Sequence, residues 1–340
     1  MKHLLFPFIL SSAVSFVVSS AALPAAEEEL VKSKTVSSSD RVTVKTGNTD
    51  RLQFLHGGPG KELFKPYISI LTTPEGRNIL RDAPADHIHH HGLMFAVKID
   101  GVNFWEERPG NKAGKEILDL PSFVTRSDIK FTPVGKEGKT ELSRWRETMG
   151  GHLDWCNPAG EKLASEDRHI VFLLGGKNAV PDAVLVDWTS AFSPAPGRQS
   201  VKIGGNDYHG LGMRFHESMD KNGTFFSDNE KNPAEHLRGT ENLTVCNWMA
   251  YTANLDDKPV TVAVFDCPVN VRKMRAFTMQ DGKTVFAYLS ATVNLHREPV
   301  TATHDKPVVF RYGVCLWEGR RTAEEVEKAY QQWLQYAAHP

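Results

Sequence analysis

Short apolar runs separated by turn residues dominate the chain beyond about residue 50. In residues 307–317 every second side chain is apolar, and a period of two is typical of a half-buried antiparallel strand. Further runs rich in β-branched and aromatic residues predict strands over residues 65–73, 93–100, 168–174, 183–192, 243–253, 259–267 and 284–293. Asp, Asn, Gly and Pro fill the segments between them, as turns require, and no fixed-period repeat is visible.

One segment near the C-terminus has helical periodicity. Thr322 followed by Glu325 forms a capping box, and apolar residues then recur at helical spacing from Val326 to Leu334. This pattern predicts a helix over residues 322–337 that packs on the sheets. The predicted fold class is therefore all-β: a large antiparallel β-sandwich with a C-terminal helix, formed by residues 51–340 as a single domain.

The N-terminal segment shows the pattern of a secretory signal peptide. A short basic start at Lys2 is followed by an apolar run to about Val18 and by small residues near Ala22 and Ala25. The run is short for a membrane span, and no later segment is long enough for one. The alternative to a signal peptide is an uncleaved N-terminal anchor. We expect residues 1–25 to be removed on export to the periplasm or the medium, and the polar residues 26–50 to be a linker.

The net charge narrows the class of partner, and the spacing of the cysteines bears on their disulfide state. The formal net charge is −1 and no basic stripe appears, which disfavours a nucleic-acid partner. The four cysteines show no CxxC spacing, and we expect buried free thiols, although export would permit disulfides. The oligomeric state is left open by the sequence.

The stretch DHIHHHGLMF, residues 86–95, contains four histidines and one aspartate within six positions. Imidazoles titrate near neutral pH, so His89 and His90 are candidates for general acid and base. A histidine pair on one strand face can also bind a divalent metal, and the candidate ligands are Asp86, His87 and His89. An extended backbone would place His90 opposite the other three histidines. The alternative is a polar loop, or core histidines bonded to backbone carbonyls.

Aromatic and acidic residues follow one strand later, in GVNFWEERPG. A turn at Asp100–Gly101 would bring Trp105 and Glu106 back toward the histidines. Aromatic faces stack on the C–H surfaces of sugars and carboxylates bind hydroxyls, so this pairing indicates a carbohydrate ligand. Glu106 is the candidate catalytic carboxylate and Trp105 a substrate-binding residue; the alternative is a buried tryptophan beside a solvated acidic end.

Two later segments add polar residues. Residues 206–218 and 264–273 supply the candidate substrate-binding residues His209, Arg214, Asp266, Asn270 and Arg272. Glu217 is a second candidate for the catalytic carboxylate. The alternatives are an exposed polar strand face for the first segment and a structural Asx-turn for the second. The GxSxG, P-loop and HExxH signatures are missing.

Residues 86–107 resemble the signature of the PmoA-like family of exported bacterial proteins. The matching residues are Asp86, His87, His89, His90, Gly92, Gly101, Phe104 and Trp105. This chain has Ile88, His91 and Cys267 where the family has Pro, Arg and His. The membrane subunit of methane monooxygenase with that name is a multi-span helical protein, so we do not expect methane oxidation from a β-rich chain.

The resemblance implies a fold similar to the galactose-mutarotase-like supersandwich, which hosts sugar epimerases, polysaccharide lyases and hydrolase domains. We therefore expect an exported carbohydrate-active enzyme that hydrolyses, eliminates or epimerises a sugar or oligosaccharide. His89 and His90 would supply acid/base or metal-ligand groups, Glu106 or Glu217 the carboxylate, and Arg214 the grip on substrate. The alternatives are a non-catalytic glycan-binding module and a metal-dependent oxidoreductase.

Overall fold

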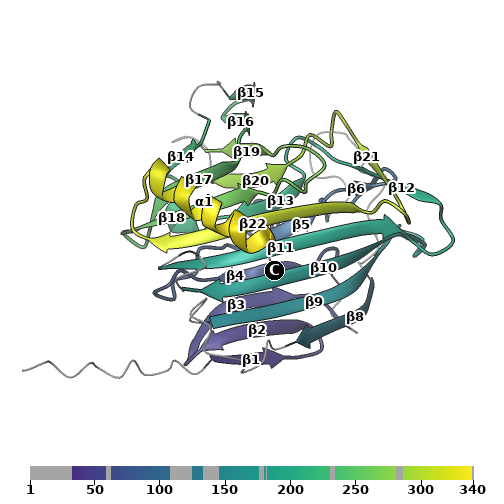
Figure 1. Ribbon diagram of the computed structural model, residues 1–340, viewed down its shortest axis with the longest axis horizontal. Helices are drawn as coiled ribbons and strands as arrows, with labels where there is room; N and C mark the ends of the chain where they lie inside the picture. Colours follow the sequence, from purple (N-terminus) through teal and green to yellow (C-terminus); the bar gives the residue numbers. More distant parts are fainter. Residues whose placement is uncertain are drawn as a thin grey trace, which may run out of the picture. The chain divides into compact units, whose positions relative to one another are not determined.

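Alternating inward and outward side chains build two large antiparallel sheets that pack face to face (Figure 1). The computed structural model describes residues 33–58, 63–107, 125–132, 145–175, 180, 182–229, 234–280 and 286–338. From Lys32 onward the chain forms one compact unit. The predicted signal peptide, residues 1–25, lies outside the described residues.

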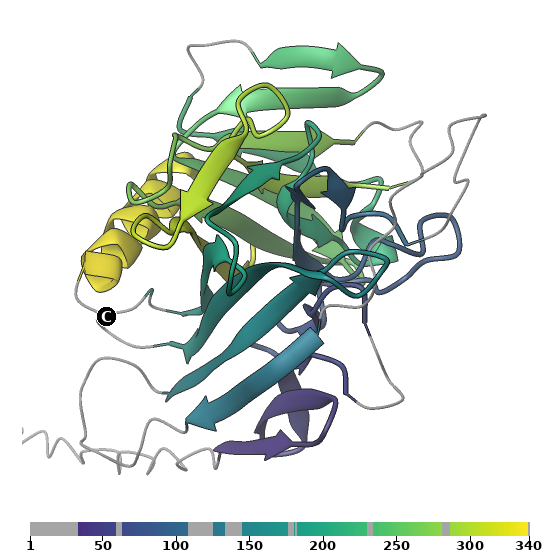
Figure 2. The ribbon, with the colours of Figure 1, turned by 90° about the vertical axis from the view of Figure 1, so that its right-hand side faces the viewer.

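The first large sheet has ten strands within the described residues. In spatial order they are β1 (Ser33–Ser37), β2 (Arg41–Thr46), β3 (Thr49–Leu55), β4 (Tyr67–Leu71), β5 (Leu93–Ala96), β13 (Gly210–Arg214), β20 (Tyr288–Thr292), β19 (Arg275–Met279), β16 (Glu241–Val245) and β15 (Glu235–Arg238). Figure 2 shows its two ends well separated, with β1 and β2 in purple and the β15–β16 hairpin in green.

The second large sheet has eight strands in the part of the chain that the structure describes. They are β14 (Thr224–Ser227), β17 (Trp248–Leu255), β18 (Lys258–Asp266), β22 (Val308–Glu318), β11 (Ala183–Pro194), β10 (Lys162–Leu174), β9 (Trp145–Cys156) and β8 (Thr125–Thr132). A small sheet contains β21 (Val300–Thr303), β12 (Ser200–Gly204), β6 (Lys98–Ile99) and β7 (Val102–Asn103). The described residues also form the 3-10 helix η1 (Glu217–Met219) and the helix α1 (Ala323–Ala338).

The main core lies between the two large sheets. Phe95 of β5 contacts Phe310 of β22 with ring centroids 5.3 Å apart, and Phe54 of β3 contacts Trp188 of β11 at 6.4 Å. All four side chains are buried. Burial of apolar surface at about 25 cal/mol per Å² is the main force that holds the sheets together. The predicted antiparallel β-sandwich with a C-terminal helix is thus confirmed.

The helix α1 covers the outer face of the eight-stranded sheet, as Figure 1 shows beside β17, β18 and β22. The predicted capping box forms, because Glu325 N donates to Thr322 Oγ1 at 3.3 Å and Thr322 N donates to Glu325 Oε2 at 2.8 Å. Trp333 packs against Gly313 of β22. This contact explains why the second half of β22 is buried on both faces, whereas alternation alone predicted a half-buried strand.

Two predicted segments differ from the structure. The predicted linker, residues 26–50, is wrong from Ser33 onward, because β1, β2 and the start of β3 lie there. The predicted single strand over residues 243–253 is two strands, β16 and β17, which belong to different sheets. The chain crosses between the sheets at Asn247, whose backbone and side-chain N–H groups donate to Asp228 at 2.9 and 2.6 Å.

As predicted, all four cysteines are buried, and none forms a disulfide with another described residue. Among the described residues, no helix has the length and apolar character needed to cross a membrane.

Gly92 precedes β5 at a position where no side chain fits. A Cβ there would lie 2.2 Å from the carbonyl oxygen of Ile68, and the Gly92 carbonyl accepts a bond from Arg214 N at 2.8 Å. Gly92→Ala is therefore expected to lower the free energy of unfolding by about 2–4 kcal/mol. Urea denaturation measures this change. Gly204→Ala is the control, since its Cβ would approach nothing closer than 3.9 Å; equal losses in both variants would contradict the prediction.

Candidate functional site

The candidate site lies on the face of the ten-stranded sheet that points away from the eight-stranded sheet. Met94 of β5, Gly212 of β13 and Ser290 of β20 are neighbours across this face. Because side chains alternate along a strand, the residues next to them fill the main core and leave this face to a separate aromatic cluster. That cluster includes Trp105 and Tyr288.

Two consecutive turns gather the histidines. His87 N donates to Pro84 O and His90 N donates to His87 O, both at 2.9 Å. The rings of His87 and His90 stack at 4.7 Å, and His89 meets His90 edge-on at 4.7 Å. The expectation from an extended backbone is therefore wrong: His87, His89 and His90 share one side, and His91 turns away to stack on Tyr67 at 4.2 Å.

The predicted turn at Asp100–Gly101 is confirmed. Both residues have positive φ, 48° and 90°, as a two-residue hairpin loop of the primed type requires. The turn joins β6 to β7 and returns the chain to the histidines. As a result Glu106 Oε2 lies 3.6 Å from His89 Nδ1.

A buried ionic network fixes the segment that carries Glu106. His91 Nδ1 contacts Asp82 Oδ1 at 2.6 Å, and its Nε2 contacts Glu107 Oε1 at 2.9 Å. Lys65 is fully buried; its Nζ donates to Glu107 Oε1 at 2.5 Å and to Trp105 O at 2.9 Å. Burial alone would raise the pKa of Glu107, but Lys65 and His91 outweigh it and lower the pKa to about 2.

The sequence interpretation missed Lys65, Asp82 and Tyr67, whose hydroxyl donates to Asp82 Oδ2 at 3.0 Å. Lys65 and Tyr67 belong to the predicted strand 65–73, where they read as ordinary strand residues. Only the pairing of β4 with β5 shows that they lie beside the histidine turns. Lys65, a charged residue at the start of an otherwise apolar strand-like run, was the one local signal that this segment contributes to a site.

Burial shifts the pKa values of His89 and Glu106 in opposite directions. Desolvation lowers the pKa of His89 to about 4, and nearby Lys65 adds to this effect. Desolvation also raises the pKa of Glu106 above its ordinary value. A neutral imidazole and a carboxyl group that holds its proton to higher pH are suited to act as base and acid. No hydrogen bond joins the two side chains, so both can face a third group.

Several buried polar atoms around this pair have no hydrogen-bond partner among the described residues. They are His89 Nδ1, His90 Nδ1, Trp105 Nε1, both ring nitrogens of His209 and all three guanidinium nitrogens of Arg214. His209 stacks on Trp105 at 5.0 Å and is fully buried. An unsatisfied buried polar atom costs about 1–3 kcal/mol, so such atoms accumulate where a ligand or water completes them.

The side chain of Arg214 is held without hydrogen bonds to other described residues. Its guanidinium carbon lies 3.6 Å from the centre of the Phe286 ring, and its Nη2 lies 3.7 Å from Asp86 Oδ2 and 3.9 Å from Asp220 Oδ2. Burial lowers the pKa of Arg214 to about 10, so the group stays charged at neutral pH. The guanidinium N–H groups carry no hydrogen bond to a described residue and could donate to ligand oxygens.

The candidate metal ligands do not converge. Asp86 Oδ2 contacts His87 Nδ1 at 2.9 Å, whereas His89 Nδ1 approaches Glu106. Among the residues that the structure describes, no group of three or more His, Cys, Asp or Glu side chains is arranged to hold a metal ion. Asp86 instead orients the imidazole of His87.

The structure places four other candidates elsewhere. Glu217 lies in η1 with 76% of its side chain exposed, and it pairs with Arg81 at 3.4 Å. Asp266 accepts from Asn270 Nδ2 at 2.7 Å and from a backbone N–H, which is the structural turn considered as the alternative. Arg272 Nη1 donates to Val293 O, just beyond the end of β20, whereas the histidines contact Tyr288 at its start.

The buried histidines predict a loss of stability at low pH. The pKa of His89 is about 4 in the folded chain, below its ordinary value of 6.5. The unfolded chain therefore binds the proton more tightly than the folded one. The contribution of His89 to the free energy of unfolding is complete above pH 6.5 and is lost as the pH falls toward 4, by up to about 3 kcal/mol. Urea denaturation at pH 7 and pH 4.5 measures the change. Between these pH values His89→Gln should lose less of its free energy of unfolding than the wild type does. The exposed His236→Gln is the control; an unchanged loss in His89→Gln would contradict the assignment.

The fold and site define a class: an antiparallel β-sandwich protein with a buried histidine-rich site on one sheet face. The chain belongs to the family of unknown function DUF6807, whose model matches residues 41–331. No curated protein sequence matches the chain. The resemblance to the PmoA-like proteins stays a prediction.

Similar solved structures include sugar-processing proteins. An α-galactosidase from Lactobacillus brevis is 9% identical with a TM-score of 0.41, over 89% of this chain and 42% of that one. An α-galactosidase from Geobacillus stearothermophilus is 8% identical with a TM-score of 0.44, over 89% and 43%. A proposed mutarotase from Salmonella typhimurium is 10% identical with a TM-score of 0.36, over 85% and 97%. The chain thus spans less than half the length of the two α-galactosidases.

Proposed function

We propose that this chain is an exported carbohydrate-active enzyme that uses Glu106 and His89 as an acid/base pair. The observation that carries the proposal is the set of buried, unpartnered nitrogens around that pair. Arg214 and Trp105 can only donate, whereas neutral imidazoles can donate through one nitrogen and accept through the other. A ligand that satisfies them must present many oxygens in a small volume.

Aromatic rings support a sugar over other oxygen-rich ligands. Phe286 and Tyr288 flank His90 at centroid distances of 5.6 and 5.0 Å, and Trp105 lies 6.0 Å away. A sugar offers hydroxyl groups at its rim and C–H groups on its faces, so it matches polar nitrogens and rings together. Glu106 would donate a proton and His89 would accept one; hydrolysis, elimination and epimerisation all use such a pair. The signal-peptide pattern supports export.

A glycan panel tests the proposal. The panel includes oligosaccharides, glycosides and their oxidised keto forms, and product is detected by mass spectrometry. We expect turnover of at least one member by the wild type and by the exposed control His236→Ala, and none by His89→Ala/His90→Ala. Binding without turnover by the wild type would support the glycan-binding alternative. Full activity of the double variant would show that the site is wrongly placed.

A further inference from the structure

A pocket of about 490 Å³ lies on the small four-stranded sheet. Lys98 of β6 and Lys202 of β12 line it, and Leu295 and Pro299 form an apolar wall. Gly204 and Gly205 leave room on its floor, since a Cβ on Gly204 would meet nothing closer than Pro299 at 3.9 Å. Its volume falls within the range of about 300–1,000 Å³ that is typical of small-ligand sites.

The pocket presents positive charge and N–H donors. Neither Lys98 nor Lys202 forms an ion pair with another described residue, and Lys98 Nζ has only a long contact of 3.4 Å to Asn206 Oδ1. The acidic member of the lining, Asp100, is already occupied: Oδ2 accepts from Arg198, and Oδ1 accepts from Lys202 N at 2.8 Å. Lys98 helps to lower the pKa of Glu106, but neither ammonium group forms a direct ion pair with a described carboxylate, and an oxyanion in the pocket would supply one.

This pocket adjoins the histidine site, and the buried His209 lies between the two. Gly205 packs against His209, since a Cβ there would lie 2.9 Å from His209 Cβ. On its other side His209 stacks on Trp105. Asn206 links the two regions as well, because it contacts Lys98 through Oδ1 and donates from Nδ2 to the Tyr208 hydroxyl at 3.3 Å. The chain connects them directly, as β5 leads into β6 and β12 leads into β13.

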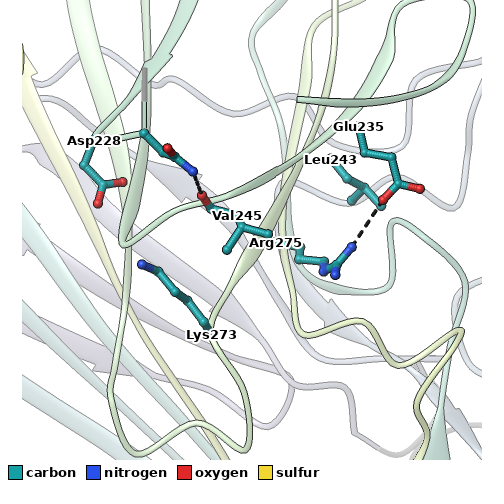
Figure 3. Close-up of a pocket in the computed structure, with 7 residues that line it drawn as sticks. Asp228, Glu235, Leu243, Val245, Lys273 and Arg275 are labelled. Atoms are coloured by element: carbon teal, nitrogen blue, oxygen red, sulfur yellow. Dashed lines mark hydrogen bonds and ion pairs between the residues drawn. The ribbon is translucent and has the colours of Figure 1, made fainter. Parts of the chain in front are cut away.

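Another pocket, of about 530 Å³, offers a contrast (Figure 3). It is lined by two cations and two carboxylates, and Arg275 Nη1 is already paired with Glu235 Oε2 at 3.2 Å. It lies where Val245 of β16 pairs with Arg275, at the end of β19 away from Tyr288. Lys273 lines it and is exposed, so this lysine is a matched control for Lys98 and Lys202.

We propose that the pocket at Lys98 and Lys202 binds a sugar unit that carries an oxyanion, either the carboxylate of a uronic acid or a sulfate ester. The neighbouring unit of the same glycan occupies the histidine site. The second statement rests on the proposed function, whereas the first does not. The enzyme would then act on acidic oligosaccharides and would discriminate against their neutral counterparts.

Calorimetric titration of the full chain with three matched disaccharides tests this proposal. One is neutral, one ends in glucuronate and one carries a sulfate ester. We expect at least one acidic form to bind at least about tenfold more tightly than the neutral one, and less tightly as salt rises. Lys98→Met and Lys202→Met should each reduce its binding about tenfold, and Gly204→Leu should block it, while Lys273→Met leaves it unchanged.

The outcomes separate this proposal from the proposed function. Lysine-dependent binding of an acidic disaccharide that is never converted would support the pocket and count against the enzyme. Conversion of neutral and acidic forms at equal rates, with no effect of Lys98→Met, would overturn the pocket and leave the enzyme standing. The pocket is also overturned if no acidic probe binds, or if Lys273→Met weakens binding as much as Lys98→Met. The acidic disaccharide whose binding is weakened by Lys98→Met and Lys202→Met identifies the oxyanion as a carboxylate or a sulfate ester.

Discussion

Replacing Glu106 with Gln is expected to lower turnover of a carbohydrate substrate by about a hundredfold or more. The amide keeps the size of the side chain and its approach to His89, which is 3.6 Å in the wild type, but it cannot transfer a proton. General acid–base groups typically contribute 10²–10⁴-fold to a rate. Substrate binding should change far less, so kcat should fall while KM stays within a few-fold. Steady-state kinetics on the substrate found in the glycan panel measures both constants.

Glu217→Gln is the matched control, because the same change is made on an exposed carboxylate of η1 that is paired with Arg81. It should retain wild-type turnover. The pH profile provides a second readout. His89 must be neutral to accept a proton, so the acid limb of kcat/KM, which reports the free enzyme, should reflect its pKa of about 4. Wild-type kcat in Glu106→Gln, or a large loss in Glu217→Gln, would show that the carboxylate has been wrongly chosen.

Replacing Glu107 with Gln is expected to lower the free energy of unfolding by about 3–5 kcal/mol. The change removes the charge that faces Lys65, whose side chain is fully buried. Breaking one partner of a buried ion pair leaves the other charge desolvated without compensation, which is why the cost is large. His91 Nε2 would also lose a carboxylate partner. Chemical denaturation at pH 7 measures the change.

The double variant Lys65→Met/Glu107→Leu is the informative companion. Removing both charges avoids the uncompensated lysine, so this variant should be more stable than Glu107→Gln alone. Its turnover should nevertheless be impaired, since Lys65 Nζ also holds the carbonyl of Trp105, next to Glu106. A single variant as stable as the wild type, or a double variant less stable than the single one, would argue against a buried ion pair here.

Much of the fold could be predicted from local periodicity. Alternation in residues 307–317 predicted β22, and the capping box at Thr322 predicted α1, because both patterns depend only on neighbours along the chain. The same holds for the turn at Asp100–Gly101, where the residue types tolerate positive φ. That turn was enough to predict that Trp105 and Glu106 return to the histidines.

The order of strands within a sheet is not encoded locally. The run 243–253 reads as one strand, yet its halves join different sheets, since the crossing at Asn247 is set by contacts with Asp228. Likewise Asp266 and Asn270 resemble a site segment in sequence, but they complete a structural turn at the end of β18, where Asn270 Nδ2 also donates to Arg311 O of β22. Nothing in local spacing distinguishes polar residues that line a site from those that stabilise a turn.

The sequence by itself determined the class of fold and the helix, and it named His89, His90, Glu106 and Arg214 as candidate site residues. Only the tertiary structure decided their surroundings. It separated His91 from the other histidines by pairing it with Asp82 and Glu107. The tertiary structure also brought Lys65 to the site, and it placed Lys98 and Lys202 in a pocket beside the site. The physical reason is that burial and charge pairing depend on residues distant in the chain, whereas periodicity reports only which face a side chain occupies.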